Sequence, residues 1–339
     1  MKLVCLCDIA IPQAIMEPMK ELEKYGLEVV FVDDAGIQSA ETFTEAMIKA
    51  EQEGADACPA DPNFVEAVRD ADIAVVHVSP VNTAVLEAAA KLKCVAVLRS
   101  GIENVQEQLC RERGIRIVNA PGRGAHSVAD FTVALMLAEA KNVTRGHKYL
   151  MEGKWVRQFP NRKYIHDLRN CTVGIIGAGQ IGQKVIDRLR GFGCAILVHD
   201  PFLSDEEITR LGYNPVSLET LLSQSDFVSL HLRLSEKTQN FITKRELDVM
   251  KETAYLINTA RAGLVDEAAL VETLQNKRIG GAALDVFQEE PLGADSPFLQ
   301  LDNVTLTPHL GGTSADTVSN SVEIIKNALT ELFESGAFS

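Results

Sequence analysis

Three polar side chains in the last third of the sequence could together oxidise an alcohol or reduce a ketone. Arg261, Glu290 and His309 each follow shortly after a short apolar run. A histidine titrates near neutrality and can exchange the proton of a hydroxyl group. A carboxylate bonded to its second ring nitrogen would fix the tautomer and stabilise imidazolium. An arginine can grip a carboxylate with two parallel hydrogen bonds and polarise the adjacent carbonyl.

Each of these residues also has a structural interpretation when it is taken alone. A histidine at the end of a strand is more often structural than catalytic, and an arginine there is usually a salt-bridge partner. Glu290, which follows Glu289, could belong to a solvated loop. The three residues together, in a chain that also carries a nucleotide-binding motif, favour a catalytic site.

The nucleotide-binding motif is a glycine-rich turn between a strand-like run and a helical pattern. Its sequence is Gly177-Ala178-Gly179-Gln180-Ile181-Gly182, and the next strand-like run leads to Asp200. The first glycine permits a tight turn, the second lets the backbone approach a pyrophosphate, and the third lets the helix pack on the strand. The N-terminus of the helix offers free N–H groups and the positive end of its dipole.

Asp200 stands 18 residues after Gly182, where an acidic residue is expected to accept hydrogen bonds from a ribose diol. Two alternatives remain at this point. The glycines could serve a plain strand–helix–strand unit, and Asp200 could be a turn residue at the end of a strand. The order of strand, glycines, helix, strand and terminal acid favours dinucleotide binding.

Short apolar strands alternate with amphipathic helical patterns along the whole chain, which predicts an α/β fold with parallel sheets. The strands expected in the first third are 2–7, 28–32, 73–78, 94–98 and 115–118. Those expected in the rest are 172–176, 194–198, 226–230, 254–258, 279–284 and 303–307. Two doubly wound sheets follow from these two series. In such sheets ligands bind at the carboxyl ends of the strands, where the candidate residues lie.

Three longer segments complete the expected secondary structure. Residues 125–149 are rich in apolar side chains and predict one helix that is deeply buried or packs on another subunit. The polar segment 36–62 predicts an elaborated connection with a short helix. The last strong helical pattern is 315–333.

Length and composition exclude several classes of protein. The chain has 339 residues, enough for about two domains, and its 46% hydrophobic and 24% charged residues are ordinary for a globular protein. The net charge of −14 argues against nucleic acid and anionic membranes as partners. No apolar run approaches the length of a membrane span, and the apolar start is interrupted by Asp8, which predicts a buried strand and no signal peptide.

The seven cysteines are scattered through apolar stretches and lack the paired spacing of zinc ligands. Cys5 and Cys7 are the only cysteines close together in the sequence, and no second pair is present to complete a set of zinc ligands. We therefore expect buried, reduced core thiols, no metal site and a cytoplasmic protein.

The sequence resembles the D-isomer-specific 2-hydroxyacid dehydrogenases, which include phosphoglycerate, glycerate/hydroxypyruvate, D-lactate and formate dehydrogenases. The likeness covers nearly the whole chain and is strongest over residues 94–313. It rests on the glycine-rich motif with Asp200 and on three more motifs. These are Asn258-Thr259-Ala260-Arg261 with Val265-Asp266-Glu267, Asp285-Val286-Phe287 with Glu290-Pro291, and Pro308-His309 with Gly311-Gly312.

The resemblance implies an NAD-dependent enzyme that interconverts a small D-2-hydroxy acid and its 2-keto acid, of the hydroxypyruvate/glycerate, phosphoglycerate or sugar-acid type. Arg261 would hold the substrate carboxylate, Glu290 would orient the histidine, and His309 would be the acid–base. Residues lining the cofactor would be Gly177, Gly179, Gln180, Ile181, Gly182, Asp200, Thr259, Ala260, Asp285, Gly311 and Gly312. Residues contacting the substrate would be Arg99, Ser100, Gly101 and Ile102.

The resemblance also implies an architecture. A Rossmann-type NAD domain at 119–308 would be inserted in a flavodoxin-like substrate domain formed by 1–118 and 309–339. The protein would be a homodimer made largely by the helix at 125–149. A rival of another class is an NAD-sensing binding protein like the C-terminal-binding corepressors, which keep this fold. Turnover of NADH with 2-keto acids would separate the two.

Two departures from the family pattern affect specificity. His231-Leu232-Arg233 replaces the usual His-x-Pro, which can alter the adenine side of the cofactor site. Arg99 stands where many members have glycine. It could meet a second polar group of a longer substrate, such as a phosphate or the hydroxyls of a sugar acid. It could equally be a surface residue that points to solvent or pairs with Glu103.

Overall fold

The computed structural model describes residues 1–338 and divides into two compact units. Unit 1 joins Met1–Gly124 to the C-terminal segment that begins at Ser314, and unit 2 is Ala125–Thr313. Both boundaries lie a few residues later than the expected 118/119 and 308/309. The loop that carries His309 stays with unit 2 because its backbone is hydrogen-bonded to Asp285 of that unit.

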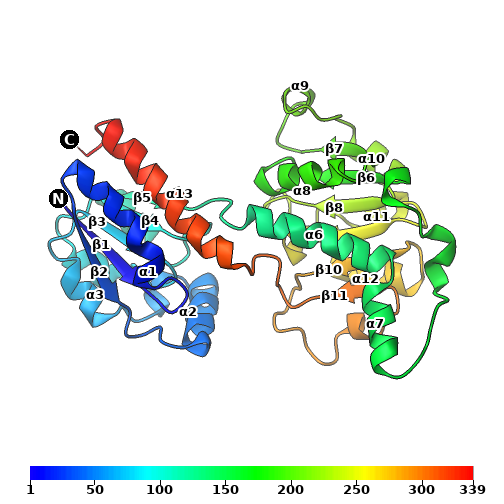
Figure 1. The fold of residues 1–339 in the computed structure, drawn as a ribbon, viewed down its shortest axis with the longest axis horizontal. Coiled ribbons are helices and arrows are strands. Elements are labelled where there is room, and N and C mark those ends of the chain that lie inside the picture. Colours follow the sequence, from blue (N-terminus) through cyan, green and yellow to red (C-terminus); the bar gives the residue numbers. More distant parts are fainter. Residues whose placement is uncertain (339) are drawn as a thin grey trace. The chain divides into compact units, whose positions relative to one another are not determined.

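Unit 1 contains a five-stranded parallel sheet whose strand order is β2-β1-β3-β4-β5 (Figure 1). This is the flavodoxin-like order, in which the direction of winding switches between β1 and β3. The strands are β1 (Lys2–Cys7), β2 (Glu28–Asp33), β3 (Ile73–Val76), β4 (Cys94–Val97) and β5 (Arg116–Asn119). All five lie where the alternation of apolar runs predicts them.

The apolar residues of β1 explain why unit 1 has helices on both faces of its sheet. Leu3, Cys5 and Cys7 are buried on one face and Val4 and Leu6 on the other, as the two-residue period of a strand requires. The first face packs against α1 (Gln13–Met16), the 3-10 helix η1 (Glu17–Tyr25) and α13 (Ala315–Glu334). The second packs against α3 (Pro62–Ala67), α4 (Thr83–Ala88) and α5 (Glu107–Glu112).

The polar connection of unit 1 contains a longer helix than expected. Helix α2 (Ala40–Glu53) occupies 14 residues, and Ser39 caps it by accepting a hydrogen bond from the Thr42 N–H. The side chain of Thr42 bonds back to the Ser39 N–H, which satisfies a second free donor at this end of the helix. The prediction of a short helix was therefore too conservative.

Unit 2 contains a six-stranded parallel sheet of order β11-β10-β9-β8-β6-β7. Its strands are β6 (Thr172–Ile176), β7 (Ala195–His199), β8 (Phe227–Leu230), β9 (Tyr255–Asn258), β10 (Gly281–Leu284) and β11 (Val304–Leu306). Beyond β7, Pro215 makes a single parallel bridge to Val198. The residues on either side of Pro215 make the hydrogen bonds of this bridge, because the Val198 N–H donates to the Asn214 carbonyl and the Val216 N–H donates to the Val198 carbonyl, both at 3.0 Å. With it, the order is that of dinucleotide-binding sheets.

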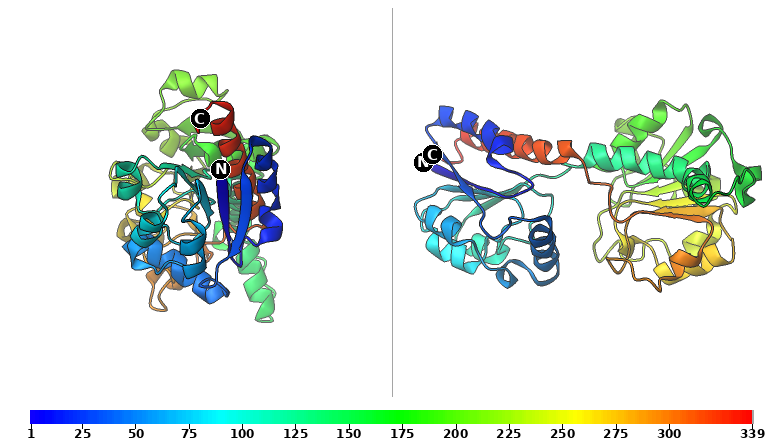
Figure 2. Two further views of the ribbon diagram at one scale, coloured as in Figure 1. Left: turned by 90° about the vertical axis from the view of Figure 1, so that its left-hand side faces the viewer. Right: turned by 60° about the horizontal axis from the view of Figure 1, so that its bottom comes forward.

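Both faces of the unit 2 sheet are covered by helices (Figure 2). Helices α6 (Ala125–Ala140) and α8 (Gln180–Arg190) share one core with the sheet. Helices α10 (Leu218–Gln224), α11 (Lys244–Val249) and α12 (Glu267–Gln275) share the other. Helix α9 (Asp205–Arg210) follows β7, and its Ile208 joins the core of α6 and α8.

The single helix expected at 125–149 is wrong, because two helices occupy this segment. Helix α6 ends at Ala140, and α7 (Val143–Met151) begins after Asn142, whose φ of 56° is left-handed. Asparagine tolerates this conformation better than most residues. Arg145 of α7 pairs with the buried Glu139 of α6 at 2.6 Å and holds the bend. No helix among residues 1–338 is long and apolar enough to cross a membrane.

Candidate active site

The glycine-rich motif forms a tight turn between β6 and α8, as its sequence predicts. Gly177 has a φ of 101°, and a Cβ on it would lie 2.8 Å from the His231 carbonyl group. A Cβ on Gly182 would lie 2.0 Å from the Gly177 carbonyl oxygen. Side chains are therefore excluded at both positions by backbone atoms that cannot give way.

The middle of this turn is open and rich in free hydrogen-bond donors. No atom lies within 4 Å of the place where a Gly179 Cβ would stand. Among residues 1–338, nothing accepts from the N–H groups of Gly179, Gln180 and Ile181 at the start of α8. Free N–H groups at the positive end of a helix dipole suit a pyrophosphate. The turn therefore fits the phosphate part of a dinucleotide.

Asp200 lies immediately after β7 and is held by two backbone groups. Its Oδ2 accepts a hydrogen bond from the Ala178 N–H and its Oδ1 from the Phe202 N–H, both at 2.8 Å. The first bond fixes the carboxylate beside the glycine-rich turn. Asp200 thus ends its strand as a turn residue beside the glycine-rich turn.

His309 and Glu290 form a hydrogen-bonded pair at the carboxyl edge of the same sheet. The distance between His309 Nδ1 and Glu290 Oε2 is 2.8 Å, and Glu290 Oε1 accepts from the Phe287 N–H at 3.0 Å. The second bond holds the carboxylate in place. Because the carboxylate accepts, Nδ1 carries the proton toward it and Nε2 is left for chemistry. About half of the His309 side chain is exposed, so a ligand can reach it.

Asp285 holds the backbone that carries His309. One carboxylate oxygen accepts from the Thr307 hydroxyl at 2.6 Å and the Leu310 N–H at 2.8 Å, and the other accepts from the Gly311 N–H at 2.8 Å. His309 itself has a left-handed φ of 53°. The buried Asp285 therefore holds the unfavourable backbone conformation of His309 through residues that precede and follow it. The sequence motif did not indicate this positioning function.

Arg261 lies after β9, the neighbour of β10, and its backbone is shaped by Asn258. The Asn258 side chain donates to the Arg261 carbonyl at 2.9 Å and accepts from the Ala260 N–H at 3.0 Å. The Arg261 guanidinium is exposed and donates only to the Ala260 carbonyl within residues 1–338. The fork of the arginine is thus available to a carboxylate.

Helix α6 contributes two contacts that sequence reasoning missed. The Thr132 hydroxyl lies 2.7 Å from the Thr259 hydroxyl, and the Ser127 hydroxyl donates to the Gly311 carbonyl at 2.8 Å. Both tie site loops to a helix far from them in sequence. The signal for them in the sequence was weak, namely two hydroxyl residues within a largely apolar helical pattern.

The substrate candidates of unit 1 form a loop directly after β4. Within residues 1–338, the N–H groups of Ser100, Gly101 and Ile102 make no hydrogen bonds. The Ser100 hydroxyl donates to the Ala120 carbonyl at 3.1 Å, which anchors the loop. Arg99 is only 6% exposed and pairs with Glu51 at 2.6 Å. Neither surface alternative for Arg99, solvent or pairing with Glu103, describes this geometry.

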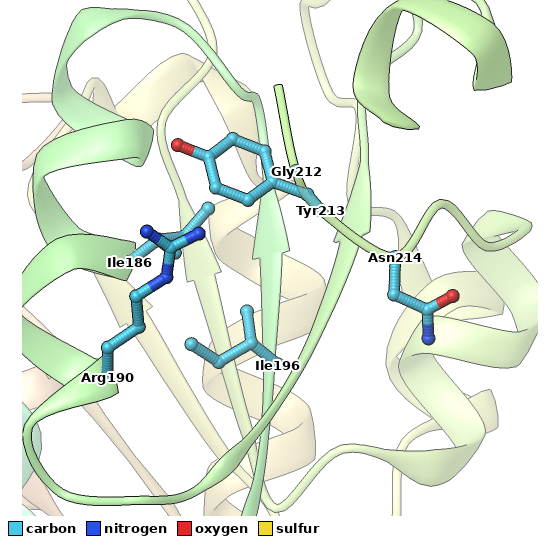
Figure 3. Close-up of a pocket in the computed structure, with 6 residues that line it drawn as sticks. All are labelled: Ile186, Arg190, Ile196, Gly212, Tyr213 and Asn214. Carbon is cyan, nitrogen blue, oxygen red and sulfur yellow. The ribbon is translucent and has the colours of Figure 1, made fainter. Parts of the chain in front are cut away.

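Two other features lie outside this site. A cavity of about 180 Å³ opens beside the first half of β7, away from the glycine-rich turn (Figure 3), and is lined by Ile186, Arg190, Ile196, Gly212, Tyr213 and Asn214. Within residues 1–338, no group of three or more His, Cys, Asp or Glu side chains could hold a metal ion. All seven cysteines are unpaired, and only Cys194 is partly exposed.

The sheet order, the glycine-rich turn and the Glu290–His309 pair define a nucleotide-dependent oxidoreductase. A family model described as the NAD-binding domain of D-isomer specific 2-hydroxyacid dehydrogenases matches residues 133–311. The chain belongs to this family. The expected family, two-sheet fold and NAD cofactor are thereby confirmed, and a 2-hydroxy acid dehydrogenase is favoured over a corepressor-like binding protein.

Individual relatives agree with this assignment. A glyoxylate reductase of Korarchaeum cryptofilum is 40% identical over 276 residues, which are 81% of this chain and 83% of that protein. A hydroxypyruvate reductase of Thermotoga maritima is 36% identical over 79% of this chain and 87% of that protein. The solved TT0316 protein of Thermus thermophilus is 31% identical, with a TM-score of 0.71 over 99% of this chain and 97% of that one. The chain spans about half the length of matching D-3-phosphoglycerate dehydrogenases.

Proposed function

We propose that the chain reduces short 2-keto acids to D-2-hydroxy acids, with glyoxylate, hydroxypyruvate and their phosphorylated or longer relatives as the candidate substrates. The observation that carries this proposal is the Glu290–His309 pair, 2.8 Å apart at the sheet edge that also bears the glycine-rich turn. The names of the relatives, glyoxylate reductase and hydroxypyruvate reductase, support the substrate class.

The roles of the catalytic residues follow from their hydrogen bonds. NAD, when bound, supplies or accepts the hydride. Glu290 holds Nδ1 of His309, so Nε2 gives its proton to the keto oxygen during reduction and takes it back during oxidation. Arg261 grips the substrate carboxylate through its free fork and polarises the neighbouring carbonyl.

The remaining candidate residues lie on loops of unit 2, for the cofactor, and on a loop of unit 1, for the substrate. Gly177, Gly179, Gln180, Ile181 and Gly182 receive the pyrophosphate, and Asp200 receives the ribose. Thr259, Ala260, Asp285, Gly311 and Gly312 remain candidates for the nicotinamide side, with Asp285 also positioning the His309 loop. In unit 1, the free N–H groups of Ser100, Gly101 and Ile102 are the substrate donors.

An assay of NADH oxidation with a panel of 2-keto acids tests the proposed function. We expect turnover with glyoxylate and hydroxypyruvate and none with aldehydes that lack a carboxylate, because Arg261 needs that group. A protein that binds NADH but turns over none of the panel would instead behave as an NAD-sensing binding protein.

We expect a preference for NADH over NADPH of about tenfold or more, because Asp200 would repel a 2′-phosphate. Asp200→Asn removes this charge and should narrow the ratio of kcat/KM for the two cofactors. Asp187→Asn, on the exposed side of α8, is the matched control and should not change the ratio. Equal kcat/KM for both cofactors in the unaltered protein would leave Asp200 as a turn residue only.

Glu290→Gln should lower kcat/KM for 2-keto acid reduction by about tenfold. The Glu290 carboxylate accepts a hydrogen bond from His309 Nδ1 at 2.8 Å, and a neutral glutamine holds the ring less firmly and does not offset the positive charge that the ring carries when it donates its proton to the keto oxygen. Glutamine still offers an oxygen to Nδ1. Glu289→Gln is the control for loss of a neighbouring charge. If Glu290→Gln kept the kcat/KM of the unaltered protein, the carboxylate would have no part in orienting His309.

We further propose a cytoplasmic homodimer without nucleic-acid or membrane partners. Unpaired cysteines and the net charge of −14 support the location and the partners. The dimer is supported by large apolar side chains of α7 and the following segment, including Met151 and Trp155, which are 75% and 80% exposed. Sedimentation velocity tests it, and a monomer at micromolar concentration would contradict it.

A further inference from the structure

The residues that follow β8 border the same edge of the unit 2 sheet as the glycine-rich turn. Strand β6 has β7 on one side and β8 on the other, so the direction of winding switches between β6 and β8. Open α/β sheets bind their ligands outside the carboxyl ends of the strands at such a switch point. A residue directly after β8 is therefore placed beside a dinucleotide held by the turn after β6.

The register of the strands puts the end of β8 level with the glycine-rich turn. Ile176 of β6 pairs with His199 of β7 and with Leu230 of β8. The next residues, Asp200 and His231, therefore lie on either side of the start of the turn. Neighbouring strands are about 5 Å apart, which separates the chain ends at these two residues by about 10 Å.

Arg233 lies two residues beyond this level, on a backbone that is held on both sides. The preceding Leu232 is buried in the core that the sheet shares with α10, α11 and α12. The Arg233 carbonyl accepts a hydrogen bond from the buried Thr238 hydroxyl at 2.7 Å, and Thr238 Oγ1 accepts from the Ser235 N–H at 2.8 Å. The loop therefore presents the Arg233 side chain from a fixed position.

The Arg233 guanidinium is not used by the fold. It is exposed and makes no hydrogen bond or ion pair within residues 1–338. A guanidinium carries five N–H donors and no acceptor, and its fork matches two oxygens of a phosphate. A free arginine beside a nucleotide site is thus able to bind a phosphate group of the nucleotide.

The carboxylate of Asp200 indicates which phosphate needs such a cation. The pyrophosphate has the free N–H groups at the start of α8. The two Asp200 oxygens are fixed at 2.8 Å by the N–H groups of Ala178 and Phe202, so the carboxylate is not free to turn away from a phosphate on the ribose. A cation after β8 would offset the repulsion between that phosphate and the carboxylate.

We propose that Arg233 is a cofactor-specificity residue that binds the 2′-phosphate of NADPH, and that it makes the chain more tolerant of NADPH than Asp200 alone would allow. The phosphate would accept hydrogen bonds from the free guanidinium. This inference rests on the proposed role of Asp200 at the ribose. It does not depend on which 2-keto acid the chain reduces.

Binding to the full chain without substrate tests the proposal. The probes are ADP-ribose and 2′-phospho-ADP-ribose, which differ only in the 2′-phosphate, and calorimetric titration measures their Kd. Arg233→Gln should weaken binding of the phosphorylated probe by roughly tenfold and leave that of ADP-ribose unchanged. Tenfold is the lower end of the effect of one hydrogen bond to a charged group, because the residue is exposed. The loss should shrink at high ionic strength.

Matched variants and a kinetic measurement accompany the titrations. Arg278→Gln is the control, because this exposed arginine precedes β10 at the opposite edge of the sheet, and it should change neither Kd. Arg233→Lys keeps the charge without the fork and should lose less than Arg233→Gln. With a 2-keto acid that is turned over, Arg233→Gln should raise the ratio of kcat/KM for NADH to that for NADPH by the same factor.

The same titrations in an Asp200→Asn background separate a direct contact from an effect through Asp200. A direct contact keeps its roughly tenfold loss there. A loss that disappears would mean that Arg233 only neutralises Asp200, and the proposal would be overturned. Equal weakening of both probes would assign Arg233 to the pyrophosphate and also overturn it, as would unchanged binding of both. Absence of turnover with every 2-keto acid would overturn the proposed function and leave the result for Arg233 in place.

Discussion

Replacement of His309 by asparagine should lower kcat/KM for 2-keto acid reduction by about 10²- to 10⁴-fold, the usual effect of losing a general acid–base. Asparagine is the better choice than alanine because His309 has a left-handed φ of 53°, which asparagine tolerates. The loss can then be attributed to proton transfer and not to collapse of the loop. Steady-state kinetics with glyoxylate or hydroxypyruvate and NADH measure it.

Two further measurements make the His309 result decisive. NADH binding, followed by fluorescence, should be nearly retained in His309→Asn, because no cofactor phosphate contact is assigned to this side chain. His166→Ala, at an exposed histidine of the same unit, is the control and should keep full activity. Near-normal turnover of His309→Asn would remove this residue from the chemistry.

Arg261→Ala should lower kcat/KM by roughly 10²- to 10⁴-fold, since two hydrogen bonds to a charged group contribute about 3–6 kcal/mol together. The loss should appear in both KM and kcat, because the guanidinium binds the carboxylate and also polarises the reacting carbonyl. Arg261→Lys keeps the charge without the fork and should recover only part of the activity. Kinetics with glyoxylate provide the measurement.

The control for Arg261 is Arg278→Ala, an exposed arginine that precedes β10 at the opposite edge of the sheet. It should leave kcat and KM unchanged. If Arg261→Ala raised KM alone, the residue would bind ground state and transition state equally and would not polarise the carbonyl.

The amino-acid sequence by itself determined the strands, the glycine-rich turn and the edge at which the polar residues gather. Period-two burial is a local property, as Leu3 and Val4 show by packing on opposite faces of one strand. The turn could be predicted from the glycines at 177 and 182, because a side chain at either position would collide with backbone atoms. The pairing of Glu290 with His309 was implied by the resemblance to the dehydrogenase family, and in the structure the two residues follow strands that are neighbours in the parallel sheet.

The sequence did not indicate where one helix ends and the next begins within the apolar segment 125–149. The break between α6 and α7 depends on Asn142 in a left-handed conformation and on the buried Glu139–Arg145 pair. All three residues fit a continuous helical pattern, in which nothing marks Glu139 and Arg145 as partners. Their pairing favours the bend because the carboxylate of Glu139 is buried and needs a cation and a hydroxyl donor nearby.

Only the tertiary structure decided which polar groups meet across long distances in sequence. Asp8, His77 and Arg123 are far apart along the chain and carry no common motif, yet parallel strands bring their carboxyl ends to one edge. Arg99 finds Glu51 on a helix whose length was underestimated, and Asp285 meets the loop of His309. A buried polar group must find a partner, but several partners in the sequence are chemically equivalent, and only the packing of strands and helices selects one.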